Sequence, residues 1–353
     1  IRVPTLVLHH EHDACWACRP YEARNIVDGL KNAPVRKLTL VSGGSGATGD
    51  PCEPLHYHGY AGMQNEAVDL IARRAASGRG GFVLTPNLDR LAALVPAEFW
   101  SKRAAIALVI ALVAVLGVRA WESLSGPPLE PWHTFVPTEL PADEIARTDW
   151  HGYLAAEQAA FDEVRREVSG KLAPRARVAS NRYFDGSPLD PARFTTDWNR
   201  SFVLEPAGAP AGTVVLLHGL TDSPYSMRGV ARLYRDRGYV AVVIRLPGHG
   251  TVPAGLTGVD WQAWSQATRL AVREARRRAP APAPLHVVGY SNGGALAMKY
   301  ALDAIDDRSL PRPDRLVLIS PMIGVTSMAR FAGIVGWPAL FPSFARAAWL
   351  GIV

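Results

Sequence analysis

The sequence has very little cysteine. Its 353 residues include three, Cys15, Cys18 and Cys52, all within the first sixth of the chain. This number and grouping predict no disulfide framework. The spacing of Cys15 and Cys18 also occurs in thioredoxin-like redox sites, and with Cys52 or the nearby histidines a zinc site could be drawn. A thioredoxin-like site needs a β-α-β frame for which the sequence before Cys15 is too short. We therefore expect a loop with two partly buried thiols and no metal.

The sequence also lacks the signatures of nucleotide and nucleic-acid binding. The stretch Gly43–Gly46 is not followed by Gly-Lys-Ser or Gly-Lys-Thr, so it predicts a flexible loop rather than a phosphate site. The net charge of +6 comes largely from scattered arginines. A denser group at 273–278 ends a predicted helix, where cations complement the helix dipole. We therefore expect no nucleic-acid partner and no cofactor.

The apolar run Ala104–Val118 is short for a membrane helix. As a helix it would span about 22 Å, less than the hydrocarbon thickness of about 30 Å. Flanking charged and aromatic residues could make up the difference by snorkelling. These residues are Trp100, Lys102, Arg103, Arg119 and Trp121. We predict a single membrane anchor at 104–120, with the residues after 120 on the non-cytoplasmic side because basic residues gather before it. The alternative is a buried core helix or the hydrophobic region of a signal peptide.

The motif with the most chemical content is Gly289-Tyr290-Ser291-Asn292-Gly293. A short apolar run precedes it and a helical pattern, 295–302, follows it. Together they predict the strand, sharp turn and helix of a nucleophile elbow. Side chains at Gly289 and Gly293 would collide with the neighbouring strand and helix. The N–H groups that begin the helix point at the serine, where negative charge develops during acyl transfer. We therefore predict Ser291 as a nucleophile.

Further motifs lie upstream of the elbow. A buried-strand run, 213–217, ends in His218-Gly219-Leu220, and a helix at 227–237, a strand at 240–246 and Pro247-Gly248-His249-Gly250 follow. In an acyl-transfer enzyme the first of these loops supplies an oxyanion-hole donor. We assign that donor to the backbone N–H of Leu220, paired with the N–H of Asn292.

From about residue 200 to 325 the chain resembles the α/β-hydrolase superfamily, and within it monoacylglycerol lipases and lysophospholipase-like serine hydrolases. The oxyanion loop, the Pro-Gly-His-Gly turn and the elbow occur in the expected order. The resemblance implies structural roles for His218 and His249, because the family takes its catalytic base from the end of the fold.

Residues 1–75 resemble the C-terminal part of such a hydrolase. Strands are expected at 5–8 and 35–41, and helices at 21–31 and 66–74. The resemblance places the acid on Asp13, after the first strand, and the base on His58, with His56 as the fallback. A carboxylate would fix the tautomer of the imidazole, which would take the proton of the serine.

The whole chain then divides into five parts. Residues 1–75 are the C-terminal part of an α/β-hydrolase and 76–103 a linker. Residues 104–120 are the anchor, and 121–199 form an extended segment and an amphipathic helix that Thr148 or Asp149 can cap. Residues 200–353 are the N-terminal part of an α/β-hydrolase. The resemblance implies that the apolar stretch from Met322 begins a lid, and a buried helix pair is the alternative. Strands are also expected at 178–184 and 201–204, and both ends of the chain look cut.

The order of these parts is unusual, because the family runs nucleophile, acid, base. Three explanations are open: a fused or fragmentary reading of two neighbouring hydrolases, a circular permutation with Asp13, His58 and Ser291 as one triad, or a non-catalytic relic. The predicted fold class is α/β, with helices on both faces of a hydrolase sheet that is split in sequence. The predicted function is hydrolysis of carboxylic esters of acylglycerol or lysophospholipid kind through an acyl-enzyme. The alternative is a catalytically inactive, membrane-tethered hydrolase-like fusion or fragment.

Overall fold

The computed structural model describes residues 3–15, 19–48, 51–52, 56–76 and 129–322, with isolated positions between 110 and 121. The chain separates into two compact units. One is formed by Ile1–Gly78 and Glu130–Thr326, the other by Arg79–Leu129 and Ser327–Val353. The first unit contains the described sheet and the candidate site. Nearly all of the predicted linker, and the lid predicted after Met322, lie outside the described residues.

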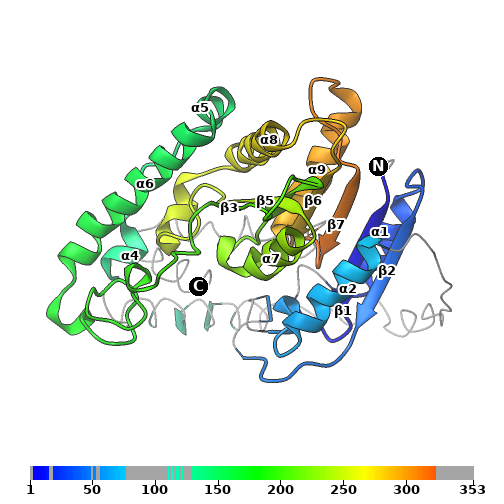
Figure 1. Cartoon of the computed structure of the whole chain (residues 1–353). Helices are drawn as coiled ribbons and strands as arrows, with labels where there is room; N and C mark the ends of the chain where they lie inside the picture. The colour runs from blue at the N-terminus through cyan, green and yellow to red at the C-terminus, as the bar shows by residue number, and fades with distance from the viewer. Residues whose placement is uncertain are drawn as a thin grey trace. The chain divides into compact units, whose positions relative to one another are not determined.

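Seven strands form a sheet in the order β2-β1-β7-β6-β4-β5-β3 (Figure 1). Neighbouring strands are parallel, except that β3 is antiparallel to β5. The strands β4, β5 and β6 are almost wholly buried, as expected for parallel strands covered on both faces. The strands are β1 (Thr5–His10), β2 (Arg36–Val41), β3 (Phe202–Leu204), β4 (Gly212–Leu217), β5 (Tyr239–Ile244), β6 (Leu285–Tyr290) and β7 (Arg315–Ile319).

Strand β1 joins the beginning of the chain to its later part. It pairs with β2 on one side and with β7 on the other, with Thr5 opposite Leu316 and Leu8 opposite Ile319. Beyond the ladder, the N–H of Ser320 donates to the carbonyl of Leu8 at 2.9 Å. In Figure 1 the blue β1 and the orange β7 accordingly lie side by side.

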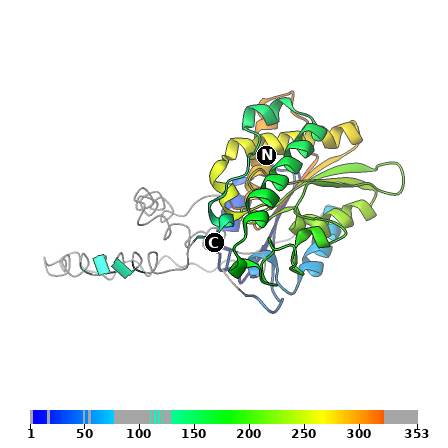
Figure 2. The same cartoon turned by 90° about the vertical axis from the view of Figure 1, so that its left-hand side faces the viewer.

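Helices cover both faces of the sheet, as predicted. Alternate residues of β4 belong to different cores: Val215 and Leu217 pack with α1, α5, α6, α8 and α9, whereas Val214 and Leu216 pack with α2 and α7. Because successive side chains of a strand point to opposite faces, these are the two sides of one sheet. Figure 2 shows the helices and the sheet from a second direction. The helices are α1 (Glu22–Gly29), α2 (Gln64–Ala76), α4 (Pro131–Thr134), α5 (Ala142–Arg147), α6 (Trp150–Glu167), α7 (Arg228–Asp236), α8 (Trp261–Arg278) and α9 (Asn292–Asp306).

The segment before β3 departs from the prediction in one place. Helix α6 forms, and Asp149 caps it by accepting from the N–H of Gly152 at 2.8 Å. The strand predicted at 178–184 is wrong, because this stretch is a series of turns. The side chain of Asn181 donates to the carbonyl of Ala176 and accepts from the N–H of Tyr183, so local bonds replace a strand ladder.

A buried ionic cluster fastens this segment to the sheet. Arg245, next to the end of β5, is 1% exposed. Its guanidinium donates to both carboxylate oxygens of Glu139, at 2.7 and 2.9 Å, and to Glu157 of α6 at 3.1 Å. Glu139 also accepts from the N–H of Gly248 at 2.9 Å. The cluster therefore binds the turn after β5 to Glu139 and to α6.

The prediction of a single-pass membrane protein is wrong. Within the part of the chain that the structure describes, no helix combines the length and the apolar character needed to cross a bilayer. Most of the predicted anchor, 104–118, lies outside the described residues. The sequence argument relied on snorkelling side chains to extend a run that was itself too short.

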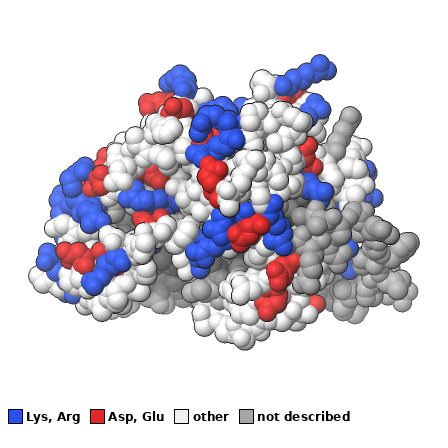
Figure 3. Space-filling view, in the orientation of Figure 1, with Lys and Arg blue, Asp and Glu red and all other residues white. Residues whose placement is uncertain are grey.

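Charged residues of both signs are mixed on the surface. On the face drawn in Figure 3, Lys and Arg are interspersed with Asp and Glu. The arginines that end α8 follow this pattern, because Arg277 and Arg278 both pair with Glu274. The cluster predicted to end a helix therefore lies in its last turn with an acidic partner.

Buried histidine predicts a pH dependence of stability. Burial, with Arg315 nearby, lowers the pKa of His286 on β6 to about 4. The unfolded chain, with an ordinary histidine pKa of about 6.5, therefore binds more protons between these values, and stability falls as the pH falls through them. His286→Phe keeps the ring beside Tyr234 and Tyr239. It should reduce the slope of unfolding free energy against pH by up to about 1.4 kcal/mol per pH unit, measured by urea unfolding. An unchanged slope would contradict this.

Candidate active site

The turn between β6 and α9 has the conformation of the predicted elbow. Ser291 lies at φ 51° and ψ −117°, after the last residue of β6 and before the first of α9. Its N–H donates to the carbonyl of Ile319 on β7 at 2.9 Å, and its carbonyl accepts from the N–H of Met322 at 3.0 Å. A positive φ is costly for serine, so these contacts hold a strained residue at the carboxyl end of the interior strand β6.

Two glycines make this turn possible, as predicted. A Cβ on Gly289 would lie 2.2 Å from the carbonyl oxygen of Gly293. A Cβ on Gly293 would lie 2.3 Å from the carbonyl oxygen of Leu217, at the end of β4. Helix α9 can therefore start directly against the ends of β4 and β6 only because these side chains are missing.

The loop after β4 runs beside the serine. The position of a Cβ on Gly219 would be 3.4 Å from the Cβ of Ser291. Among the described residues, the backbone N–H groups of Leu220 and Asn292 have no hydrogen-bond acceptor. Asn292 is the first residue of α9, where N–H groups have no partner within the helix. Both groups are thus free to donate to a ligand, and their role as oxyanion-hole donors remains a prediction.

His218 and His249 are engaged in their own loops, as the family resemblance implied. The Nε2 of His218 accepts from the N–H of Leu246 at 3.0 Å, so its proton is on Nδ1, which donates to the carbonyl of Gly219 at 2.9 Å. The ring of His249 packs edge-on against the ring of His218, with centroids 4.9 Å apart. Burial lowers the pKa of both rings, that of His249 to about 4. Both are therefore neutral near pH 7.

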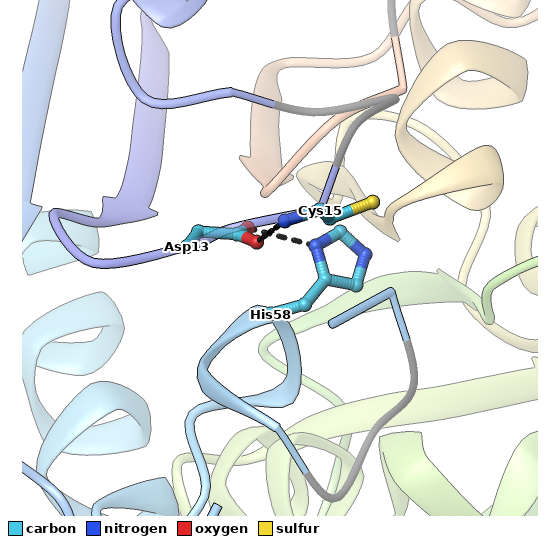
Figure 4. A group of neighbouring side chains, drawn as sticks. All are labelled: Asp13, Cys15 and His58. Atoms are coloured by element: carbon cyan, nitrogen blue, oxygen red, sulfur yellow. Dashed lines mark hydrogen bonds and ion pairs between the residues drawn. The ribbon is translucent and has the colours of Figure 1, made fainter. Parts of the chain in front are cut away.

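The predicted acid and base lie in contact, in loops after β1 and β2 (Figure 4). The Nδ1 of His58 donates to Oδ2 of Asp13 at 2.8 Å. The other carboxylate oxygen, Oδ1, accepts from the N–H of Cys15 at 2.9 Å. Both side chains are buried. His56, the fallback base, has instead a buried Nδ1 without a hydrogen-bond partner among the described residues.

The pair of Asp13 and His58 lies next to the elbow. The ring of His58 is 5.3 Å from the ring of Tyr290, which precedes the serine. Within the described part of the chain, no hydrogen bond joins Ser291 to His58. The structure therefore brings the predicted acid and the predicted base together. It places His58 beside Tyr290, the residue before Ser291, without a hydrogen bond to Ser291 itself.

Backbone strain is concentrated in this region. The non-glycine residues with positive φ in the described part of the chain are Tyr60, Ser291 and Ser320. The hydroxyls of Tyr60 and Ser320 lie 3.2 Å apart, which ties the loop of His58 to the end of β7. Sequence reasoning missed both residues. Strained residues cluster at functional sites because the surrounding structure must hold them there.

A disulfide between Cys15 and Cys52 corrects the expectation of free thiols. It connects the loop of the acid to the segment just before the base. Cys15 has a sulfur within 4.8 Å of ligand atoms of Asp13 and His58. That sulfur is already bonded to Cys52, so it is not the thiolate that metals prefer. The sequence offered one signal for this disulfide: Cys15 lies close to Asp13 and Cys52 close to His58, and these two site residues were predicted to be in contact.

The elbow glycine is testable by a matched pair of substitutions. Gly293→Ala should lower the free energy of unfolding by more than about 3 kcal/mol, because its methyl group meets backbone that cannot move aside. Gly229→Ala, on the exposed side of α7, meets its nearest neighbour, Cγ2 of Val68, at an ordinary contact distance of 4.0 Å and should raise it by about 0.5 kcal/mol. Urea unfolding of both variants measures the difference. Equal stabilities would show that the turn is relaxed.

Parts of the chain are similar to known proteins. Residues 208–348 match the family model described as serine aminopeptidase, S33. Over 92 residues the chain is 33% identical to a thermostable monoacylglycerol lipase from Bacillus sp. (strain H-257), covering 26% of this chain and 35% of the lipase. Over 161 residues it is 29% identical to the magnesium-chelatase 30 kDa subunit of Rhodobacter capsulatus, covering 42% of this chain and 45% of that protein. A solved structure of metagenome-derived lipolytic enzymes is 27% identical with a TM-score of 0.30, over 34% of this chain and 45% of that one.

The chain thus spans less than half the length of the curated relatives it matches. The family match begins before β4 and includes the loop of Gly219, the turn after β5 and the elbow. These are the segments on which the sequence resemblance was based, and the resemblance is confirmed. Over residues 208–348 the chain is therefore similar to the α/β-hydrolase superfamily.

Proposed function

We propose that this protein hydrolyses carboxylic esters through an acyl-enzyme formed on Ser291. The observation that carries the proposal is the serine at φ 51°, at the start of α9 and next to the loop of Gly219. The N–H groups of Leu220 in this loop and of Asn292 in α9 have no acceptor among the described residues. A helix N-terminus and free N–H groups stabilise an oxyanion, which is the charge that acyl transfer develops. The serine is 9% exposed, so the reaction would take place largely away from bulk water.

We propose His58 as the general base and Asp13 as the residue that orients it. In the first step Oγ of Ser291 bonds to the ester carbonyl carbon, and its proton passes to Nε2 of His58. The hydrogen bond from Nδ1 to Asp13 leaves Nε2 unprotonated to accept that proton and stabilises the imidazolium. Serine and base are not hydrogen-bonded in the structure without substrate, and such contacts often tighten only when substrate binds.

The developing oxyanion would accept from the N–H groups of Leu220 and Asn292. Collapse of the tetrahedral intermediate breaks the bond to the alcohol, which leaves with the proton from Nε2 of His58. Water then attacks the acyl group by the same route and releases the acid and Ser291. These steps need no cofactor.

We further propose that residues 1–75 and 200–353 build one hydrolase sheet in permuted order. The ladder between β1 and β7 supports this, because it is parallel and continues the sheet of the second part without a break. The bond between the hydroxyls of Tyr60 and Ser320 supports it too. The predicted boundaries of these two parts, at residues 75 and 200, are part of the same proposal.

For the substrate we propose esters of acylglycerol or lysophospholipid kind. The similarity to a monoacylglycerol lipase supports this class. Hydrolysis of a series of monoacylglycerols and lysophospholipids of different chain length would rank them.

Labelling with a serine-directed phosphonate tests the nucleophile. The parent protein should become labelled and hydrolyse a short-chain p-nitrophenyl ester. Ser291→Ala should abolish the label and lower kcat by about 10⁴-fold or more. Ser309→Ala, at an exposed turn, is the matched control and should behave as the parent does. Absence of labelling in the folded parent would mean that the fold is kept without the activity.

A second set of variants tests the base and the acid. His58→Ala should lower kcat by at least about 10³-fold, and Asp13→Asn by about 10⁴-fold, because the imidazole would lose its base function or its correct tautomer. His56→Ala should stay within a fewfold of the parent. If His56→Ala is the inactive variant, the assignment of the base to His58 is wrong.

A further inference from the structure

In the peptide group between Gly219 and Leu220, the carbonyl is hydrogen-bonded and the N–H is not, among the described residues. The carbonyl oxygen of Gly219 accepts from Nδ1 of His218 at 2.9 Å. The N–H of Leu220 has no acceptor among the described residues. Because a peptide group is planar and trans, this carbonyl and this N–H lie in one plane and point in opposite directions. A contact that fixes the carbonyl therefore also sets the direction of the N–H.

The ring of His218 is itself held at both nitrogens. Nε2 accepts from the N–H of Leu246, and a backbone N–H can only donate, so Nε2 is unprotonated and the ring proton is on Nδ1. The ring is fully buried, beside His249 and Arg245, and burial keeps its pKa well below the usual range. The ring is therefore neutral, and only one tautomer fits both contacts.

The donor to Nε2 is fixed in turn by the ionic cluster. The N–H of Arg245, one residue before Leu246, donates to Oγ of Ser201 at 2.8 Å. The guanidinium of Arg245 binds Glu139, which also accepts from the N–H of Gly248. Leu246 thus lies between two residues whose backbone N–H groups are both bound. A movement of the His218 ring would need this turn to move as well.

We propose that His218 is a positioning residue that directs the N–H of Leu220 toward the oxyanion formed at Ser291. It does so by donating from Nδ1 to the carbonyl of Gly219. This inference rests on the proposed function, in which that N–H stabilises the transition state. It adds a residue that touches neither the substrate nor the reacting atoms. A Cβ on Gly219 would lie 3.4 Å from the Cβ of Ser291, so the loop that carries this N–H runs beside the serine.

Two substitutions separate the two contacts of the ring. In His218→Asn the side-chain amide can place an N–H where Nδ1 was, but nothing reaches Leu246. In His218→Gln the amide oxygen can reach the N–H of Leu246, but the donor to Gly219 is lost. Each variant loses one buried hydrogen bond, so both should shift the midpoint of urea unfolding to a similar extent. A purely structural role would make them equally active.

The expected kinetic result is a difference in kcat alone. With a short-chain p-nitrophenyl ester, His218→Gln should lose about 10²-fold in kcat, the order of magnitude for one oxyanion-hole donor. His218→Asn should stay within about fivefold of the parent. KM should change little in either, because the N–H acts on charge that develops after the ester is bound. Equal kcat values in the two variants, or a larger loss in His218→Asn, would overturn the proposal.

A measurement without catalysis distinguishes this proposal from the proposed function. In ¹H–¹⁵N spectra, the amide signal of Leu220 should keep its position in His218→Asn and move in His218→Gln. If the parent hydrolyses no ester, the proposed function fails, but this signal still tests the positioning. If neither variant folds, the ring nitrogens of His218 in the parent decide: a proton on Nδ1 supports the proposal, and a proton on Nε2 overturns it.

Discussion

The candidate site depends on the pairing of β1 with β7. The carbonyl of Ile319, at the end of β7, accepts from the N–H of Ser291, and the next residue, Ser320, donates to Leu8 of β1. One end of one strand therefore touches the elbow on one side and, on the other, the strand that leads to Asp13. The ladder is formed by segments at opposite ends of the described sequence. Without it, Asp13 and His58, the proposed acid and base, would belong to a fragment separate from Ser291.

A second constraint is the buried ionic cluster next to the end of β5. The cluster of Arg245, Glu139 and Glu157 is buried, and a buried pair is weak evidence for stability, because desolvation offsets much of the attraction. Removing one partner is costly, about 3–5 kcal/mol, since a charge is left without compensation. The cluster is therefore better understood as a device that fixes geometry. It fastens the segment before β3, for which the sequence suggested no role, to the turn after β5, which contacts His218 in the predicted oxyanion loop.

The sequence predicted those parts of the site that local chemistry specifies. The elbow follows from apolar residues, two glycines and a helical pattern in direct succession, and each of these is needed by the turn itself. The family resemblance of short motifs brought Asp13 and His58 into the prediction, and they are in contact.

The parts that were missed depend on residues far apart in sequence. The disulfide of Cys15 and Cys52, the hydroxyl pair of Tyr60 and Ser320 and the partners of Arg245 are all set by tertiary structure. The false strand at 178–184 shows the opposite failure, because apolar residues suggested a ladder where Asn181 bonds to nearby backbone instead.

The ladder of β1 with β7 also has a consequence for the order of folding. During synthesis β1 is made long before its partner, so its edge stays open until β7 emerges. Contacts between such distant segments slow folding, and open edges favour association with other chains. This protein should therefore fold late and aggregate readily when its synthesis is interrupted.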